Sequence, residues 1–258
     1  LPVELAATVA RGPDGVLGPV GFTVTGSAGE LALAGAGATP DVLDRLEATG
    51  TYLPDVATFR LARMRARLGA STVDGTMTVI LSDAPFVALD AAIDALTLAD
   101  LSRLWPRDAA ATARTWLAEH ASVGTLRRCR VQLSLHGDAP ERSHAAVPTG
   151  APSTAGARNA YDVACDFDGA TAHYLPPMAP IRAASGSARL TAERLTIDVA
   201  AGIVGACRVE GGNLAMDLTV DPPRATIAAD VAGATADVLA LVDAPPLRLV
   251  TPLGIAPK

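Results

Sequence analysis

Apolar and polar residues alternate along most of this chain. The pattern is clearest in 213–220, where the apolar positions are Leu214, Met216, Leu218 and Val220. Successive side chains of a β-strand point to opposite faces of its sheet, so this segment is predicted to be a strand with one apolar and one hydrated face. Similar segments at 195–199, 203–209 and 224–231, with turns expected at 192–193, 211–212 and 222–223, predict a meander of antiparallel strands.

The first half of the chain shows the same alternation, with one irregularity. In 56–68 the arginines Arg63, Arg65 and Arg67 alternate with apolar residues, but Phe59 and Leu61 fall out of phase with them. A β-bulge inserts one extra residue into a strand and shifts the side chains that follow it to the other face. A bulge near Leu61–Ala62 is therefore predicted.

Helical signals are few, and they recur after groups of strands. Short helices are expected at 38–44 (ATPDVLD), 96–104 (LTLADLSRL) and 234–240 (ATADVLA), each with a threonine and an aspartate suited to the first turn. The second continues as a helical insertion over 97–120. Strands followed by a short helix, repeated along a chain, are typical of elongated, quasi-one-dimensional proteins. The Pro-, Ala- and Gly-rich stretch 143–157 is predicted to be a flexible loop.

These patterns predict a mainly β fold, a long antiparallel meander curved into an open, elongated groove with a few short helices between strand groups. The alternation begins at once after Leu1, which is not a methionine, so residues 1–258 are expected to be a fragment of one elongated, repeating β-groove domain. No stretch of 18 apolar residues and no signal peptide is visible. Any membrane anchor is therefore expected outside the chain.

Composition refines this picture. Hydrophobic residues make up 50% of the chain and the mean hydropathy is +0.30, yet aromatic residues contribute only 3%. A sheet face made of small aliphatic side chains fits these values, although a GC-rich genome would also explain an Ala- and Arg-rich chain with the single lysine Lys258. The net charge is −6 and no long basic run is present, which argues against nucleic-acid binding.

Residues able to support chemistry are scattered. The four histidines lack metal-ligand spacing, no serine lies in a nucleophile elbow, and Cys129, Cys165 and Cys207 are interpreted as small buried hydrophobes. Three aspartates on one predicted strand, Asp162, Asp166 and Asp168, could bind Ca²⁺ or act in glycoside hydrolysis, but a hydrated outer face is the preferred interpretation. The sequence therefore predicts no enzyme, no metal and no cofactor.

An arginine stripe has two interpretations. Its members are Arg60, Arg63, Arg65, Arg67, Arg127, Arg128 and Arg130. These side chains could meet anionic lipid head groups at the edge of a groove. Keeping an outer wall soluble is the preferred role.

The apolar face itself must be covered by something. A closed sandwich would cover it with a second sheet, whereas an open trough would hold acyl chains; a palmitoyl-length chain offers on the order of 10 kcal/mol of burial at ~0.8 kcal/mol per methylene. The residues predicted to line such a groove are Val131, Leu133, Val163, Phe167, Leu195, Ile197, Val199, Leu214, Met216, Leu218 and Ile227.

Two stretches carry a family resemblance. Residues 96–136 contain Trp105-Pro106, then Arg114 and Trp116, then a glycine that leads into a strand. Residues 167–213 contain the Tyr174-Leu175-Pro176-Pro177-Met178 turn followed by a Gly-x-Ala-x-Leu hairpin, and 233–247 fits the block after it. Together they resemble the YhdP-type branch of the AsmA-like superfamily over 94–258, whereas 1–93 is only compatible with it.

The resemblance implies a large envelope protein of Gram-negative bacteria, anchored in the inner membrane and lying mostly in the periplasm. Members resemble bridge-like lipid transfer proteins whose taco-shaped β-groove carries phospholipid towards the outer membrane. This chain is accordingly expected to be a periplasmic section that binds phospholipid acyl chains and reaches both membranes through parts outside it. The motif residues are expected to be structural.

Two other functions stay open at this stage. The chain could be a non-catalytic scaffold for outer-membrane biogenesis with a closed, filled core, or a periplasmic hydrolase that uses the three aspartates. A dry, closed interior would favour the scaffold, and activity lost in Asp166→Asn would favour the hydrolase.

Overall fold

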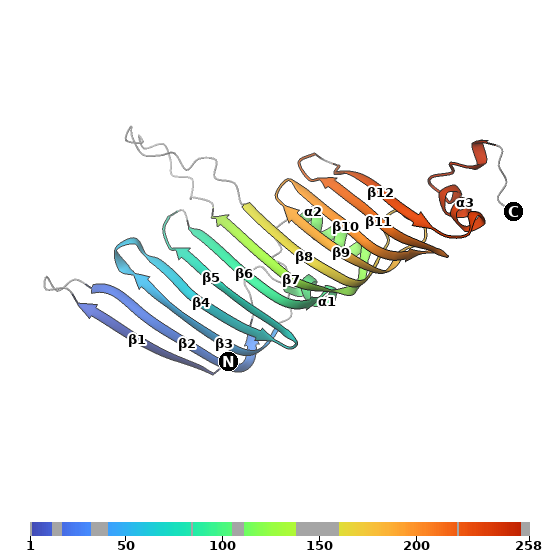
Figure 1. The fold of residues 1–258 in the computed structure, drawn as a ribbon. Helices are drawn as coiled ribbons and strands as arrows, with labels where there is room; N and C mark the ends of the chain where they lie inside the picture. Colours follow the sequence, from blue (N-terminus) through green and yellow to red (C-terminus); the bar gives the residue numbers. More distant parts are fainter. Residues whose placement is uncertain are drawn as a thin grey trace, which may run out of the picture. The chain divides into compact units, whose positions relative to one another are not determined.

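The mainly β prediction is confirmed by a computed structural model of the chain, which describes residues 2–11, 17–31, 41–83, 85–104, 111–137, 160–220 and 222–253. Within the described residues, twelve strands form one antiparallel meander in sequence order (Figure 1). Each strand therefore pairs with its sequence neighbours, as the alternation with short turns predicts.

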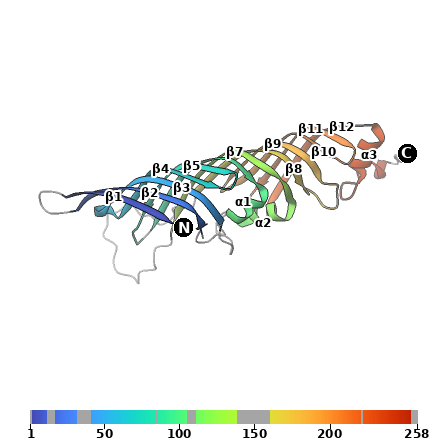
Figure 2. The same ribbon diagram turned by 90° about the horizontal axis from the view of Figure 1, so that it is seen from below.

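The strands are β1 (Val3–Arg11), β2 (Leu17–Leu31), β3 (Asp41–Leu53), β4 (Thr58–Leu68), β5 (Ser71–Ile80), β6 (Phe86–Thr97), β7 (Ala121–His136), β8 (Ala160–Ala172), β9 (Ile181–Thr191), β10 (Arg194–Val204), β11 (Cys207–Asp217) and β12 (Arg224–Ala232). The helices are α1 (Leu98–Leu104), α2 (Ala111–His120) and α3 (Thr235–Asp243), with short 3₁₀ turns η1 (Pro54–Val56) and η2 (Thr251–Leu253). Figure 2 shows α1 and α2 next to the strands β7 and β8.

The chain divides into two compact units. Unit 1 comprises the described residues of Leu1–Leu31, Val42–Ile93 and Arg130–Asp162. Unit 2 comprises those of Ala32–Asp41, Asp94–Cys129 and Val163–Lys258. Unit 1 holds most of the first six strands, and unit 2 holds β9–β12 with the three α-helices.

The predicted bulge in β4 is confirmed. Thr49 of β3 pairs with Arg63, but its neighbour Gly50 pairs with Leu61, so Ala62 is the extra residue. The pairing of β4 with β5 shifts at the same place. This insertion puts Phe59 and Leu61 in register with the apolar residues of β5, and Arg60 on the polar face with the other arginines.

Two of the predicted elements are wrong. The expected strand 203–209 is a hairpin, in which β10 ends at Val204, Gly205 and Ala206 form the turn, and β11 begins at Cys207. The turn expected at 211–212 lies inside β11, where the pairing with β12 shifts between Val209 and Gly211. The glycines thus mark a bulge rather than a turn.

The expected helix at 38–44 is also wrong over residues 41–44, which belong to strand β3. Residues 38–40 lie outside the described part, and β3 already begins at Asp41. Two helices, α1 and α2, fall within the predicted helical insertion 97–120, and α3 covers the expected helix at 234–240. The predicted loop 143–157 lies outside the described residues.

Few large side chains are fully enclosed. Within the described residues, Leu43 at 0% and Cys207 at 1% exposure are the largest that are completely buried. Strand β12 is exposed along most of its length. A closed sandwich would bury whole rows of alternate side chains between two sheets, so the low burial fits a single layer. No helix in the described ranges has the length and apolarity needed to cross a bilayer.

Candidate apolar binding site

An apolar niche lies on the face of the sheet in unit 2. Its volume is about 320 Å³, near the lower end of the ~300–1,000 Å³ typical of small-molecule sites. The sheet part is lined by Ile181, Ile197, Val199, Val204, Val209, Gly212, Asn213, Leu214, Ile227, Ala228, Ala229 and Val231. Residues outside β9–β12 complete it: Trp116, Ala172, Tyr174, Leu175, Met178, Leu241, Val242 and Leu247.

Strand register builds the floor of the niche. Ile197 of β10 pairs with Leu214 of β11, which pairs in turn with Ile227 of β12, so three aliphatic side chains form a row across the sheet. Val199 pairs with Gly212, which has no side chain to fill the space beside it. Alternation along each strand and register between strands thus place these apolar side chains on one face.

The turn after β8 and helix α2 form one wall. Trp116 of α2 stacks on His120 with ring centroids 5.1 Å apart, and the His120 carbonyl accepts a hydrogen bond of 2.7 Å from the His173 amide. The Met178 amide donates to the Leu175 carbonyl at 2.9 Å, which closes the turn. Burial raises the pKa of Tyr174 above its ordinary value of 10.0, because the ionised phenol would lose hydration.

Helix α3 and the segment after it form a second wall, through Leu241, Val242 and Leu247. The Asp243 carboxylate accepts hydrogen bonds from the Val250 amide at 3.0 Å and from the Thr251 amide and hydroxyl at 2.7 and 2.6 Å. Bonds from the Thr251 hydroxyl and amide, followed by that from Val250, stabilise the charged carboxylate and hold the pKa of Asp243 below 3.8. They also close a loop around Leu247, which lines the niche.

The niche is lined mostly by aliphatic side chains. No charged side chain is found among the residues that line it. The Asn213 side-chain amide donates at 2.6 Å to the Asp198 carboxylate and is therefore already engaged. A surface of this kind can hold a hydrocarbon chain by burial.

The predicted groove residues fall into three groups. Ile197, Val199, Leu214 and Ile227 come together in the niche. Leu195 and Met216 are register partners with 8% and 6% exposure, and they pack as part of the sheet face beside it. The remaining members are half-buried: Leu218 just after β11, Val163 and Phe167 on β8, and Val131 and Leu133 on the part of β7 that belongs to unit 1.

Alternation alone misses the walls of the niche. Trp116, Tyr174, Leu175 and Met178 belong to the motifs that carry the family resemblance, where they are expected to be structural, and the structure places all four on the niche. Leu241, Val242 and Leu247 lie in 233–247, the third block of that resemblance. Their concentration in the motif segments is a signal that could have identified them, but the sequence predicts only a structural role for these motifs.

A disulfide contradicts the interpretation of all three cysteines as small hydrophobes. Cys129 of β7 is bonded to Cys165 of β8, and both are buried, whereas Cys207 is a free buried thiol. Beside the disulfide, Arg128 Nε donates to the Asp166 carboxylate at 2.7 Å. Two side-chain links, the disulfide and the Arg128–Asp166 pair, therefore join β8 to β7. Asp166, one of the three aspartates that could support chemistry, is engaged by an arginine.

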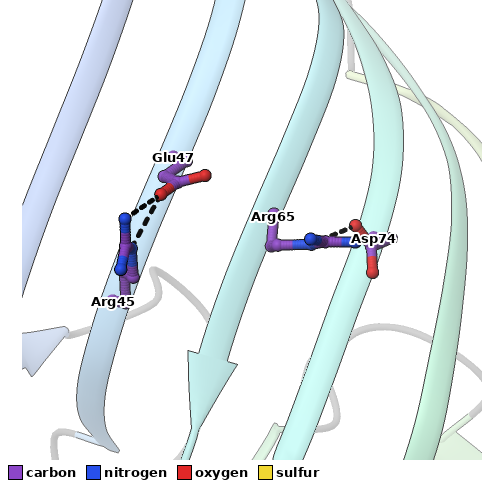
Figure 3. Close-up of polar contacts among 4 residues, drawn as sticks. All are labelled: Arg45, Glu47, Arg65 and Asp74. Carbon is purple, nitrogen blue, oxygen red and sulfur yellow. Dashed lines mark hydrogen bonds and ion pairs between the residues drawn. The ribbon is translucent and has the colours of Figure 1, made fainter.

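The described residues give no support to a metal site, and members of the arginine stripe such as Arg65 lie in ion pairs. The described residues contain no group of three or more His, Cys, Asp or Glu that could hold a metal ion. The polar face of unit 1 carries ion pairs, such as Arg65 with Asp74 and Arg45 with Glu47 (Figure 3).

No protein-family model matches the chain, and neither a curated protein nor a solved structure matches it. The resemblance to the AsmA-like superfamily stays a prediction based on the motifs. The open sheet and its apolar niche are therefore the basis for a functional proposal.

Proposed function

We propose that this chain is a non-catalytic, periplasmic section of an inner-membrane-anchored protein that carries phospholipid along an apolar β-face between the two membranes. The acyl chains would lie on the apolar side of the sheet, and the niche of unit 2 would be one position along their route. The observation that carries this proposal is the niche itself, which has an aliphatic floor, two apolar walls and no charged lining residue.

Burial energetics support this assignment. If each methylene group takes up roughly 30 Å³, about the volume of a water molecule, the niche of about 320 Å³ has room for about ten of them. Their burial would contribute ~8 kcal/mol at ~0.8 kcal/mol each. No specific polar contact is then needed, and a ligand held without such contacts can move from one aliphatic position to the next.

The disulfide supports an oxidising compartment. Disulfides persist in the bacterial periplasm and are rare in the cytosol, where thiols are kept reduced. Cys129 and Cys165 are joined across neighbouring strands and buried, which suits a structural role.

Two isoleucines provide a matched test. Ile227 and Ile203 lie on strands of unit 2 and are both 42% exposed, but only Ile227 lines the niche. Ile203 pairs with Arg208 and Arg182, which places it among polar neighbours. An aspartate at either position is therefore equally accessible to water before a ligand binds.

We expect Ile227→Asp to weaken binding of a fluorescent 16-carbon fatty acid by at least about tenfold, because the acyl chain would desolvate a carboxylate. Ile203→Asp should bind within about twofold of the wild type, and both variants should keep the β-sheet circular dichroism spectrum. Equal affinities in the two folded variants would refute the niche as the binding site.

A further inference from the structure

The polar face of strands β3, β4 and β5 concentrates positive charge. Its basic residues, which we call the arginine face, are Arg45, Arg60, Arg63, Arg65 and Arg67. Two acidic residues, Glu47 and Asp74, lie among their register partners. The whole chain carries a net charge of −6, so the sign of this surface is opposite to that of the protein.

Register brings like charges together on this face. Arg45 of β3 is directly opposite Arg67 of β4, and Arg63, Arg65 and Arg67 follow one another at alternate positions. Like charges directly opposite each other in a sheet are destabilising. A sheet whose only need is solubility gains nothing from this arrangement, whereas an anionic partner would offset the repulsion.

The two acids engage only part of the arginine face. Arg65 Nε donates to the Asp74 carboxylate at 2.6 Å and Arg45 Nε to the Glu47 carboxylate at 2.7 Å (Figure 3). Arg60 and Arg63 are exposed, and neither forms an ion pair with any residue that the structure describes. Their guanidinium groups are available to carboxylates from another chain.

The geometry points to an extended acidic polypeptide as the partner. Alternate residues of a strand are ~6.8 Å apart, so Arg63, Arg65 and Arg67 have the same spacing as carboxylates on alternate residues of an extended peptide. Of the three, Arg65 already donates to Asp74 and Arg67 Nε to the Gly69 carbonyl, which leaves Arg63 as the member without an intramolecular ion pair or side-chain hydrogen bond among the described residues. Guanidinium groups bind carboxylates in a two-point geometry. Thr49, Thr51 and Thr78, register partners of Arg63 and Arg60, add hydroxyl groups along these rows.

An anionic bilayer fits this surface less well. Within the described residues, the exposed large hydrophobic side chains next to these strands are Val56 in η1 and Leu81 just after β5, both at strand ends, and none lies among the arginines. Stable attachment to a membrane takes a second signal besides a basic patch, such as an inserted apolar group. We therefore propose that the arginine face docks an acidic, extended segment of another protein, a role that is independent of lipid binding in unit 2.

Fluorescence anisotropy with a labelled twelve-residue peptide of alternating Glu and Thr tests this proposal. Arg60→Ser/Arg63→Ser should lower its affinity by about tenfold, since each exposed charge pair contributes a modest amount. The control Arg182→Ser/Arg224→Ser removes two exposed arginines of unit 2 and gives the same net charge. It should bind within about twofold of the wild type, and binding should weaken as salt rises.

Three results would overturn the proposal. They are no binding of the alternating peptide by the wild type, the same loss of affinity in both double variants, and binding to phosphatidylglycerol vesicles that exceeds binding to the peptide. The last result would assign the arginine face to a membrane surface instead. A peptide with its glutamates in one block serves as the spacing control, and it should bind more weakly than the alternating one.

Discussion

The disulfide between β7 and β8 should contribute strongly to stability. Cys129 and Cys165 are 36 residues apart in sequence. Closing a loop of that length restricts the unfolded chain by about 13 cal/mol/K, or ~4 kcal/mol at 25 °C. We therefore expect Cys129→Ala/Cys165→Ala to lower the free energy of unfolding by about 2–4 kcal/mol, the range typical of removing a disulfide.

Urea unfolding of the two proteins, followed by circular dichroism, measures this difference, and hydrogen exchange of the β7 and β8 amides locates it. Cys207→Ala is the matched control, since Cys207 is a buried thiol outside the disulfide. Thiol titration of the denatured, unreduced protein should count one free thiol. Three titrated thiols would show that Cys129 and Cys165 are not bonded, and a double variant as stable as the wild type would show that the bond does not stabilise the fold.

Two further predictions concern unit 2. A Cβ at Gly186 would lie 2.9 Å from the Phe167 ring and against the Asp198 carbonyl. Gly186→Ala should therefore lower the free energy of unfolding by about 1–3 kcal/mol, which thermal unfolding would show as a lower melting temperature. An unchanged melting temperature would contradict the close packing. The carboxylate of Asp243 has a lowered pKa, so its contribution is present above pH 3.8 and is lost as pH falls through the folded-state pKa. Exchange of the Val250 and Thr251 amides should therefore become less protected at low pH, after correction for intrinsic rates, and Asp243→Asn should remove that dependence.

Much of the fold could be predicted from the sequence because each strand is hydrated on one face. Where one face is apolar and the other polar, the period of two fixes both the strand and its orientation. The bulge in β4 was predictable for the same reason, since in a regular strand Leu61 and Arg63 would lie on the same face, and an extra residue between them puts them on opposite faces. The arginines that reveal the shift lie on the polar side, where their phase is unambiguous.

The hairpin at Gly205 was missed because alternation continues through it. Ile203, Gly205, Cys207 and Val209 follow a period of two, yet Val204 pairs with Cys207, so Val204 rather than Ile203 faces the niche. Gly205 adopts a positive φ of 59°, which a tight turn requires and glycine permits. Composition could not separate this glycine from those at 211–212, which sit at a bulge.

The niche could be predicted only in part, because its walls depend on contacts between distant segments. Period-two reasoning finds the floor residues Ile197 and Leu214 but says nothing about where α3 and the Tyr174 turn lie. The disulfide was hidden for a related reason, since the pairing of cysteines depends on strand register, which spacing along the chain does not give. Over residues 41–44 the expected helix is wrong, because local helix signals are overridden by strand pairing in β3.

Native mass spectrometry of the gently purified chain measures directly whether the apolar face of the sheet holds lipid. We expect a population whose mass exceeds that of the protein by one or more phospholipids, and this population should fall in Ile227→Asp but not in Ile203→Asp. A folded protein that carries no lipid and takes up none from added phospholipid would show that the sheet is not a lipid-binding surface.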